Sequence, residues 1–106
     1  MPIIIDLAVV RSAKISDTKA EAQKRIYARL PQWKQANLIA RAVELHEKKI
    51  NGGTFTQGEQ DELAAGFALW DKVKAIRAAS NLIESEIKAS ADPSSVEVVN
   101  SPRWPL

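Results

Sequence analysis

The 106-residue chain contains no cysteine. Disulfide bonds, thiolate zinc sites and cysteine nucleophiles are therefore excluded, because each needs a thiol group. No apolar run approaches the roughly 20 residues that a membrane-spanning helix requires. The apolar stretch after Met1 is interrupted by Asp6 and has no basic region before it, so we expect neither a signal peptide nor a membrane partner.

Charge of one sign is not in large excess, since 15 Lys and Arg face 13 Asp and Glu for a formal net charge of +2. The basic residues are spread among acidic ones, whereas a nucleic-acid-binding protein presents a clustered basic face. We expect no nucleic-acid partner. The length suits one domain, and 45% hydrophobic and 26% charged residues indicate a folded core in a soluble protein.

Side chains with catalytic potential are few and isolated. His46 is the single histidine and lies among acidic and basic residues on the expected solvent side of a helix. Glu44 and Glu47 have helical spacing, but Lys48 offers Glu44 an ion-pair partner four residues away. Ser80 has no base near it in the sequence. We expect no catalytic, metal or cofactor site, and the protein is interpreted as a non-enzyme.

Residues 1–15 are predicted to form an extended arm or a short strand, because the run from Ile3 to Val10 is rich in Ile and Val. A lone strand leaves backbone groups unpaired. It would therefore pair with residues 96–99 or with another chain.

Residues 16–90 are predicted to be helical. Thr18 and Glu21 have the spacing of a capping box and predict a helix start, with Pro31 imposing a break after Arg29. The next helix follows to Ile50 and ends at residues 51–53, Asn-Gly-Gly, which tolerate left-handed backbone geometry.

The longest predicted helix begins at a second capping box, Thr56 and Glu59, and runs to about Ala89. Gly66 weakens it locally and leaves room for a close helix approach. The sequence thus predicts a mainly α fold: a helical hairpin of two long helices, preceded by a shorter helix, with extended N- and C-terminal arms.

Apolar residues at alternating three-four spacing predict the core of the hairpin. The predicted core residues are Trp33, Val43, Phe67, Trp70, Ile76 and Ile83. Both long helices carry apolar residues outside this seam, which suggests contacts with partners. Those predicted partner-binding residues are Leu38, Leu45, Leu69 and Leu82.

Residues 91–106 are predicted to form an extended C-terminal tail, since Pro93, Pro102 and Pro105 oppose regular structure. Trp104 has two interpretations: an exposed anchor that docks on a partner, or a side chain folded back over the protein's own core. In the first interpretation its neighbours Arg103 and Leu106 bind the partner as well.

Two stretches carry a resemblance to known proteins: RLPQWKQANLIAR at residues 29–41 and WDKVKAIRAASN at residues 70–81. Their patterns, P-x-W-K-Q-x-N followed by W-x-x-V-K-A-I-R-x-x-S-N, resemble small helical segments encoded among bacteriophage and prophage tail and tail-fibre genes. The similarity covers about residues 20–88.

The resemblance implies a virion structural protein of the tail, baseplate or tail-fibre attachment region, made in the bacterial host cytoplasm. Its partners would be other tail or fibre proteins and further copies of itself, with a trimer suiting fibre geometry. A tail-fibre assembly chaperone is the first alternative. The second is a small DNA-binding regulatory protein that presents Lys19, Lys24, Arg25 and Arg29.

Overall fold

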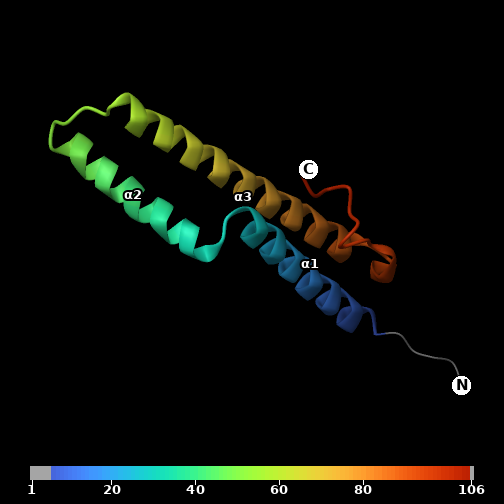
Figure 1. The fold of residues 1–106 in the computed structure, drawn as a ribbon. Helices are drawn as coiled ribbons and strands as arrows, with labels where there is room; N and C mark the ends of the chain where they lie inside the picture. Colours follow the sequence, from blue (N-terminus) through green and yellow to red (C-terminus); the bar gives the residue numbers. More distant parts are fainter. Residues whose placement is uncertain (1–5, 106) are drawn as a thin grey trace, which may run out of the picture. The chain divides into compact units, whose positions relative to one another are not determined.

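The computed structural model describes residues 6–105, and within this range the protein is mainly α-helical. Figure 1 shows three helices, α1 (Leu7–Arg29), α2 (Gln32–Ile50) and α3 (Gln57–Ala89), followed by the short 3-10 helix η1 (Pro93–Ser95). Residues 6–105 contain no strand. Among the helices of this range, none combines the length and apolarity needed to cross a membrane.

The first helix begins much earlier than the sequence predicted. Residues 7–15 are helical, so the prediction of an arm or strand is wrong for them, while Ile3–Ile5 lie outside the described residues. The carboxylate of Asp6 accepts hydrogen bonds from the backbone N–H groups of Ala8 (3.0 Å) and Val9 (3.4 Å). Such a side-chain cap stabilises a helix start and outweighs the weak strand preference of the valines.

The predicted capping box at Thr18 and Glu21 is also wrong, because Thr18 lies inside α1 and is fully buried. Its hydroxyl donates to the carbonyl oxygen of Lys14, one turn earlier, at 2.8 Å. This bond lets a polar side chain be buried on the inner side of the helix.

The predicted break at Pro31 is confirmed. At the end of α1 the backbone N–H of Leu30 donates to the carbonyl oxygen of Ile26 at 2.7 Å, and α2 begins at Gln32. The amide of Gln35 donates to the carbonyl of Leu30 at 2.8 Å, which satisfies an oxygen exposed by the break.

The turn between α2 and α3 follows the predicted local rules. Gly52 has a φ of 83°, a conformation that glycine adopts without a steric penalty. At the start of α3, the N–H of Glu59 donates to the Thr56 hydroxyl at 3.1 Å and the N–H of Thr56 donates to the Glu59 carboxylate at 2.9 Å. The second capping box is therefore confirmed.

The described residues divide into two compact units. Unit 1 comprises residues 6–25 and 74–105, and unit 2 comprises residues 26–73. The predicted boundary between residues 15 and 16 falls inside α1.

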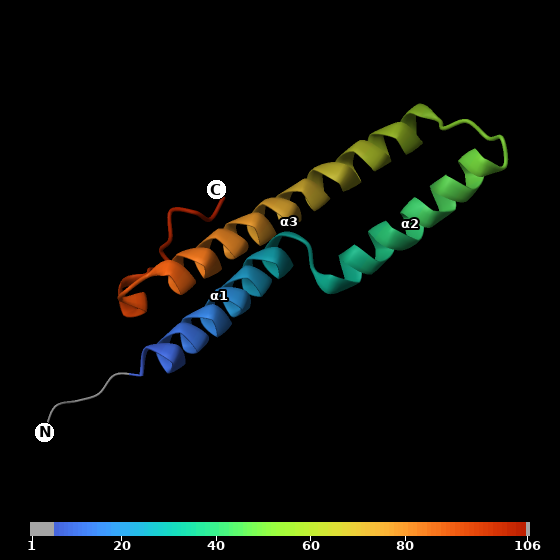
Figure 2. The same cartoon turned by 180° about the vertical axis from the view of Figure 1, so that it is seen from behind.

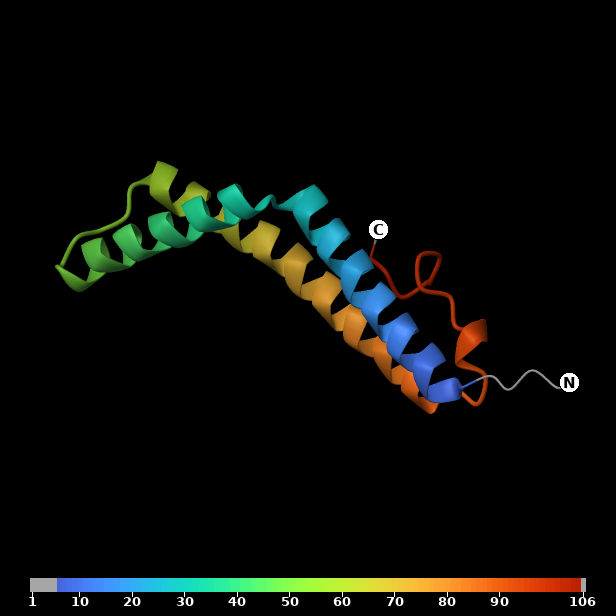
Figure 3. The same cartoon turned by 90° about the horizontal axis from the view of Figure 1, so that it is seen from below.

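Unit 1 contains most of the buried side chains. Figures 2 and 3 show α1 beside the second part of α3, with the C-terminal segment returning along them. Full burial of a large apolar side chain contributes roughly 1.5–3 kcal/mol. The buried residues of unit 1 are Thr18, Ala22, Ile76, Ala79, Ser80, Ile83, Ile87, Pro93, Val98 and Trp104.

The C-terminal segment of unit 1 is not the extended tail that was predicted. It contains η1 and turns, and three basic side chains of α1 donate to its backbone carbonyls. The pairs are Arg11 with Ser90 (2.9 Å), Lys14 with Val96 (2.9 Å) and Arg25 with Val99 (3.0 Å).

Unit 2 consists of the end of α1, α2, the turn and the first part of α3. Figure 1 shows α2 and this part of α3 side by side. Few of its side chains are fully enclosed: Leu30, Leu45 and Val73.

Candidate interaction surface

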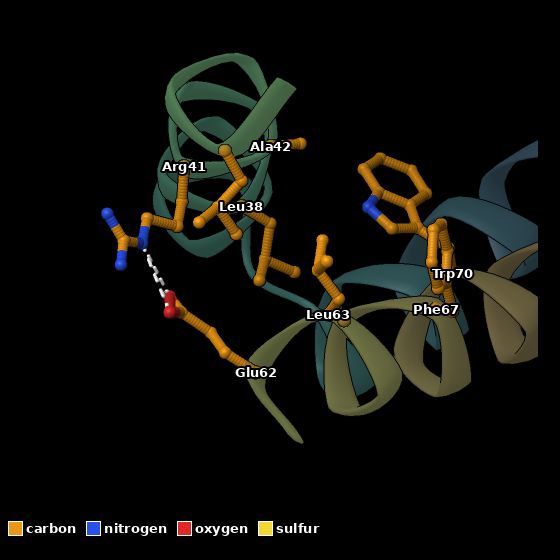
Figure 4. A pocket seen from close by; sticks show the side chains of 9 residues that line it. Leu38, Arg41, Ala42, Glu62, Leu63, Phe67 and Trp70 are labelled. Atoms are coloured by element: carbon orange, nitrogen blue, oxygen red, sulfur yellow. Dashed lines mark hydrogen bonds and ion pairs between the residues drawn. The ribbon is translucent and has the colours of Figure 1, made fainter. Parts of the chain in front are cut away.

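A small groove of about 70 Å³ opens between α2 and the first part of α3 in unit 2 (Figure 4). Leu38, Ala42 and Leu45 come from α2, while Leu63 and Phe67 come from α3. The three α2 residues share one face of the helix because they follow at intervals of four and three. The remaining lining residues are Arg41, Glu62, Gly66 and Trp70.

One side of the groove is charged. Arg41 donates through Nε to both carboxylate oxygens of Glu62, at 2.8 and 3.1 Å, and through Nη1 to Glu44 at 2.9 Å. The bond to Glu62 and then the bond to Glu44 raise the pKa of Arg41 above its usual value. Figure 4 shows the Arg41–Glu62 pair reaching from α2 to α3.

A second ion pair joins the helices nearer the turn. The Lys48 ammonium lies 2.5 Å from Glu59, so Lys48 pairs with α3 and not with Glu44 as predicted. The hydrogen bond from Lys48, and after it the one from the Thr56 backbone, lowers the pKa of the Glu59 carboxyl to about 2. Glu59 thus both caps α3 and links it to α2.

The other side of the groove is aromatic. Phe67 is 64% exposed, and Trp70 is half-buried beside it (Figure 4). Across from them Leu38 packs next to Gly66, where an added Cβ would lie 3.7 Å from Leu38 Cδ2, an ordinary van der Waals distance. A side chain as small as that of alanine would therefore fit at this position. The packing of α2 on α3 does not depend on a glycine there, contrary to what the sequence suggested.

The opposite side of α2 carries a second apolar row, which we name the outer seam. It consists of Trp33, Ala36, Ala40, Val43, Glu47 and Ile50, all exposed in the structure. Trp33 is 65%, Val43 52% and Ile50 69% exposed. Large apolar side chains gathered on one exposed helix face are typical of an interaction surface.

The predicted core is therefore only partly correct. Ile76 and Ile83 are buried as predicted, but in unit 1, which contains α1 and no residue of α2, and Trp70 is half-buried. Trp33, Val43 and Phe67 are exposed, so their assignment to the core is wrong.

The predicted partner-binding residues on the helices lie in different environments. Leu45 is buried against the groove and Leu38 is half-buried in it, so the two apolar rows of α2 are exchanged relative to the prediction. Leu69 is half-buried and Leu82 is 51% exposed.

At the C-terminus, Trp104 is 7% exposed and folds over unit 1, so the exposed-anchor interpretation is wrong. Its Nε1–H donates to the carbonyl of Val98 at 2.7 Å, and the Arg25 guanidinium lies 4.8 Å from the ring centroid. Arg103 pairs with Glu86 at 2.7 Å. Leu106 lies outside the described residues.

The basic residues considered for DNA binding differ in their surroundings. Arg25 is engaged with Glu21 at 2.8 Å as well as with the C-terminal segment. Lys19 lies 3.9 Å from Glu84, whereas Lys24 and Arg29 are exposed.

Unit 1 has a shallow hollow between α1 and the C-terminal segment, and its walls carry both signs of charge. Its charged lining residues are Lys14, Asp17, Glu21 and Lys24 of α1 and Glu97 of the C-terminal segment. Within residues 6–105 no group of three His, Cys, Asp or Glu side chains is placed to hold a metal ion. His46 is exposed on α2.

The outer seam was visible in the sequence, but its burial was misjudged. Glu47 interrupts the row, and a carboxylate is rarely buried without a partner. The row of Leu38, Ala42 and Leu45 has no such interruption and was the better candidate for the side that packs on α3.

Comparison with known proteins gives no further assignment: no family model, curated protein or solved structure matches the chain.

Proposed function

We propose that the chain is a structural protein of a bacteriophage virion, in the tail, baseplate or tail-fibre attachment region, where a helical hairpin packs against other subunits. The proposal joins the resemblance of residues 29–41 and 70–81 to tail-associated segments with one structural observation. That observation is the outer seam, which leaves Trp33, Val43 and Ile50 exposed on α2.

The seam supports an assembly role because its exposure is costly unless another protein covers it. Each large apolar side chain that becomes fully buried contributes roughly 1.5–3 kcal/mol. Such a role needs no enzyme activity, cofactor, nucleic acid or membrane. In this proposal the protein is made in the host cytoplasm and ends in the virion with other tail or fibre proteins.

Quantitative mass spectrometry of purified virions tests this proposal. A structural component is expected at a fixed stoichiometry to a major tail protein, in particles washed at high salt. Absence from finished particles, together with particles that lack tail fibres when the gene is deleted, would instead favour the fibre-assembly chaperone. Absence with normal particles after deletion would rule out both functions.

The DNA-binding alternative is tested by retention of the purified protein on a DNA column. Retention that falls steeply between 50 and 200 mM salt is expected of a protein that neutralises several phosphates. Failure to bind at low salt would remove this alternative.

A further inference from the structure

We infer that a second copy of the chain covers the outer seam, with the two α2 helices packed antiparallel. This deepens the proposed function by naming the partner of the seam, and it applies to the isolated protein as well as to a virion.

Within unit 2 the seam is directed away from the surface that α3 covers. Successive residues of an α-helix are rotated by about 100°, so Val43 and Leu45 differ by about 200°. Leu45 is buried in the groove, whereas Val43 is 52% exposed. The groove and the seam are thus separate faces of α2.

The seam is complementary in size to itself when two copies run in opposite directions. If Ala40 faces Val43 of the second copy, the same register places Ala36 opposite Glu47 and Trp33 opposite Ile50. A small side chain then meets a larger one in each inner layer, and the largest apolar residues close both ends. Alternation of this kind lets two helices pack at an even distance along their length.

Charge favours the antiparallel direction over the parallel one. A parallel pair would place the Glu47 carboxylates of the two copies next to each other in an apolar seam. The two negative charges would repel each other and would lose their hydration there. In the antiparallel register Glu47 lies 11 positions from the level of its equivalent, about 16 Å away at 1.5 Å per residue. Asn37, on the rim of the seam near that level, can donate a hydrogen bond to the carboxylate. The two helix dipoles are also opposed in this arrangement.

The size of the seam indicates a reversible dimer. It spans residues 33–50, about 26 Å of helix and roughly 10 Å in width. This contact is smaller than the about 800 Å² per partner of a standard stable interface. Ile39, 54% exposed, extends the apolar surface from the seam toward Ala42 at the groove. We therefore expect a dimer whose population depends on protein concentration.

Sedimentation equilibrium of the full-length chain over a range of concentrations tests the inference. The unmodified protein is expected to pass from monomer to dimer, and Val43→Asp is expected to raise the dissociation constant by about tenfold or more. Val9→Asp is the matched control, since Val9 is a similarly exposed helical valine (63%) in unit 1. Circular dichroism should show the same helix content in both variants.

Three results of this experiment would overturn the inference. The first is an unmodified protein that stays monomeric at every concentration. The second is a trimer, which the antiparallel two-fold arrangement does not allow. The third is an equal loss of association in Val43→Asp and Val9→Asp, which would place the contact away from the seam.

The direction of pairing is tested by disulfide cross-linking, which is clean because the chain has no cysteine of its own. An oxidised mixture of Ala36→Cys and Glu47→Cys proteins should form a covalent heterodimer, while Ala36→Cys alone should not cross-link. Disulfides need Cα atoms within roughly 7 Å, far less than the 16 Å between equivalent positions. Cross-linking of Ala36→Cys to itself with none in the mixture would show parallel pairing and contradict the inference.

The pairing and the virion role can fail independently of each other. A dimer in solution without the protein in virions would remove the virion role and keep the pairing. A monomeric protein present in virions at fixed stoichiometry would do the reverse.

Discussion

The two units of the protein use the same helix, α3, in different ways. Ile76, Ile83 and Ile87 in unit 1 are buried, whereas Phe67 in unit 2 is 64% exposed. Nine residues separate Phe67 from Ile76, and at about 100° per residue the two side chains lie about 180° apart around the helix. In unit 1, α1 and the C-terminal segment lie beside α3, and in unit 2 α2 lies beside it (Figures 1 and 2). Periodicity therefore identifies apolar residues that can pack, and the side of α3 on which the neighbouring segments lie decides which of them are buried.

The largest expected effect contrasts one residue from each stretch of α3. Ile83→Ala should lower the free energy of unfolding by roughly 2–5 kcal/mol, because it leaves a cavity in the core of unit 1. Phe67→Ala should change it by less than about 1 kcal/mol, since an exposed side chain is removed and alanine favours the helix. Urea denaturation followed by circular dichroism measures both. Equal losses would mean that the two stretches are buried alike.

A smaller loss is expected at the C-terminal segment. Trp104→Phe keeps an aromatic ring for Arg25 to contact but removes the Nε1–H that donates to Val98. We expect a loss of about 1 kcal/mol, since the Val98 carbonyl retains the longer bond from the Ser101 N–H, at 3.4 Å. Hydrogen exchange should show faster opening of residues 96–105, with α2 unchanged. Unchanged protection of the segment would mean that this bond does not hold it.

A gain in stability is expected in unit 2 from Gly66→Ala. The new Cβ has an ordinary contact with Leu38 at 3.7 Å, and alanine is favoured over glycine in a helix interior by about 1 kcal/mol. Thermal unfolding should therefore occur at a higher temperature. A decrease would show that α2 packs more closely on α3 in solution.

The smallest effect concerns pH and the ion pairs of unit 2. The pKa of Glu59 is lowered from 4.5 to about 2 in the folded protein, so its contribution to stability is present above pH 4.5 and is lost as the pH falls toward 2. Glu59→Gln keeps an acceptor for the Thr56 N–H but removes the ion pair with Lys48. Urea denaturation at several pH values should show the variant less stable than the unmodified protein at pH 7, with the difference shrinking as the pH falls below 4.5 and vanishing below about 2. A constant difference across this range would assign the effect to something other than ionisation.

Features set by neighbouring residues could be predicted from the sequence. Pro31, the turn at residues 51–53 and the box of Thr56 and Glu59 each act within a few positions, and each lies where it was expected. Thr18 and Glu21 have the same spacing but do not cap a helix, because α1 already begins at Leu7, where the Asp6 carboxylate caps it. A local motif is sufficient only when no stronger start precedes it.

Features that depend on distant contacts were not accessible in this way. The prolines beside Trp104 correctly indicate irregular backbone, but the contacts with Val98 and Arg25 that bury the ring arise from tertiary folding. On α2, both apolar rows could be predicted and their roles could not, apart from the hint given by Glu47. The sequence thus shows the apolar residues of the candidate interaction surface. Which of the two rows on α2 is exposed is decided by the side of α2 on which α3 packs.

The hydrogen bonds from α1 to the C-terminal segment imply that this segment tolerates amino-acid replacements at its exposed positions. The basic side chains of α1 donate hydrogen bonds to backbone carbonyl oxygens, which every amino acid has. Exposed positions such as Ser94 and Glu97 can therefore be replaced without loss of these bonds. These hydrogen bonds depend instead on the length of the C-terminal segment, because one inserted residue moves the carbonyl groups that follow it by up to about 3.5 Å. Over evolutionary time the exposed positions of this segment should accumulate replacements readily, and the segment should seldom gain or lose residues.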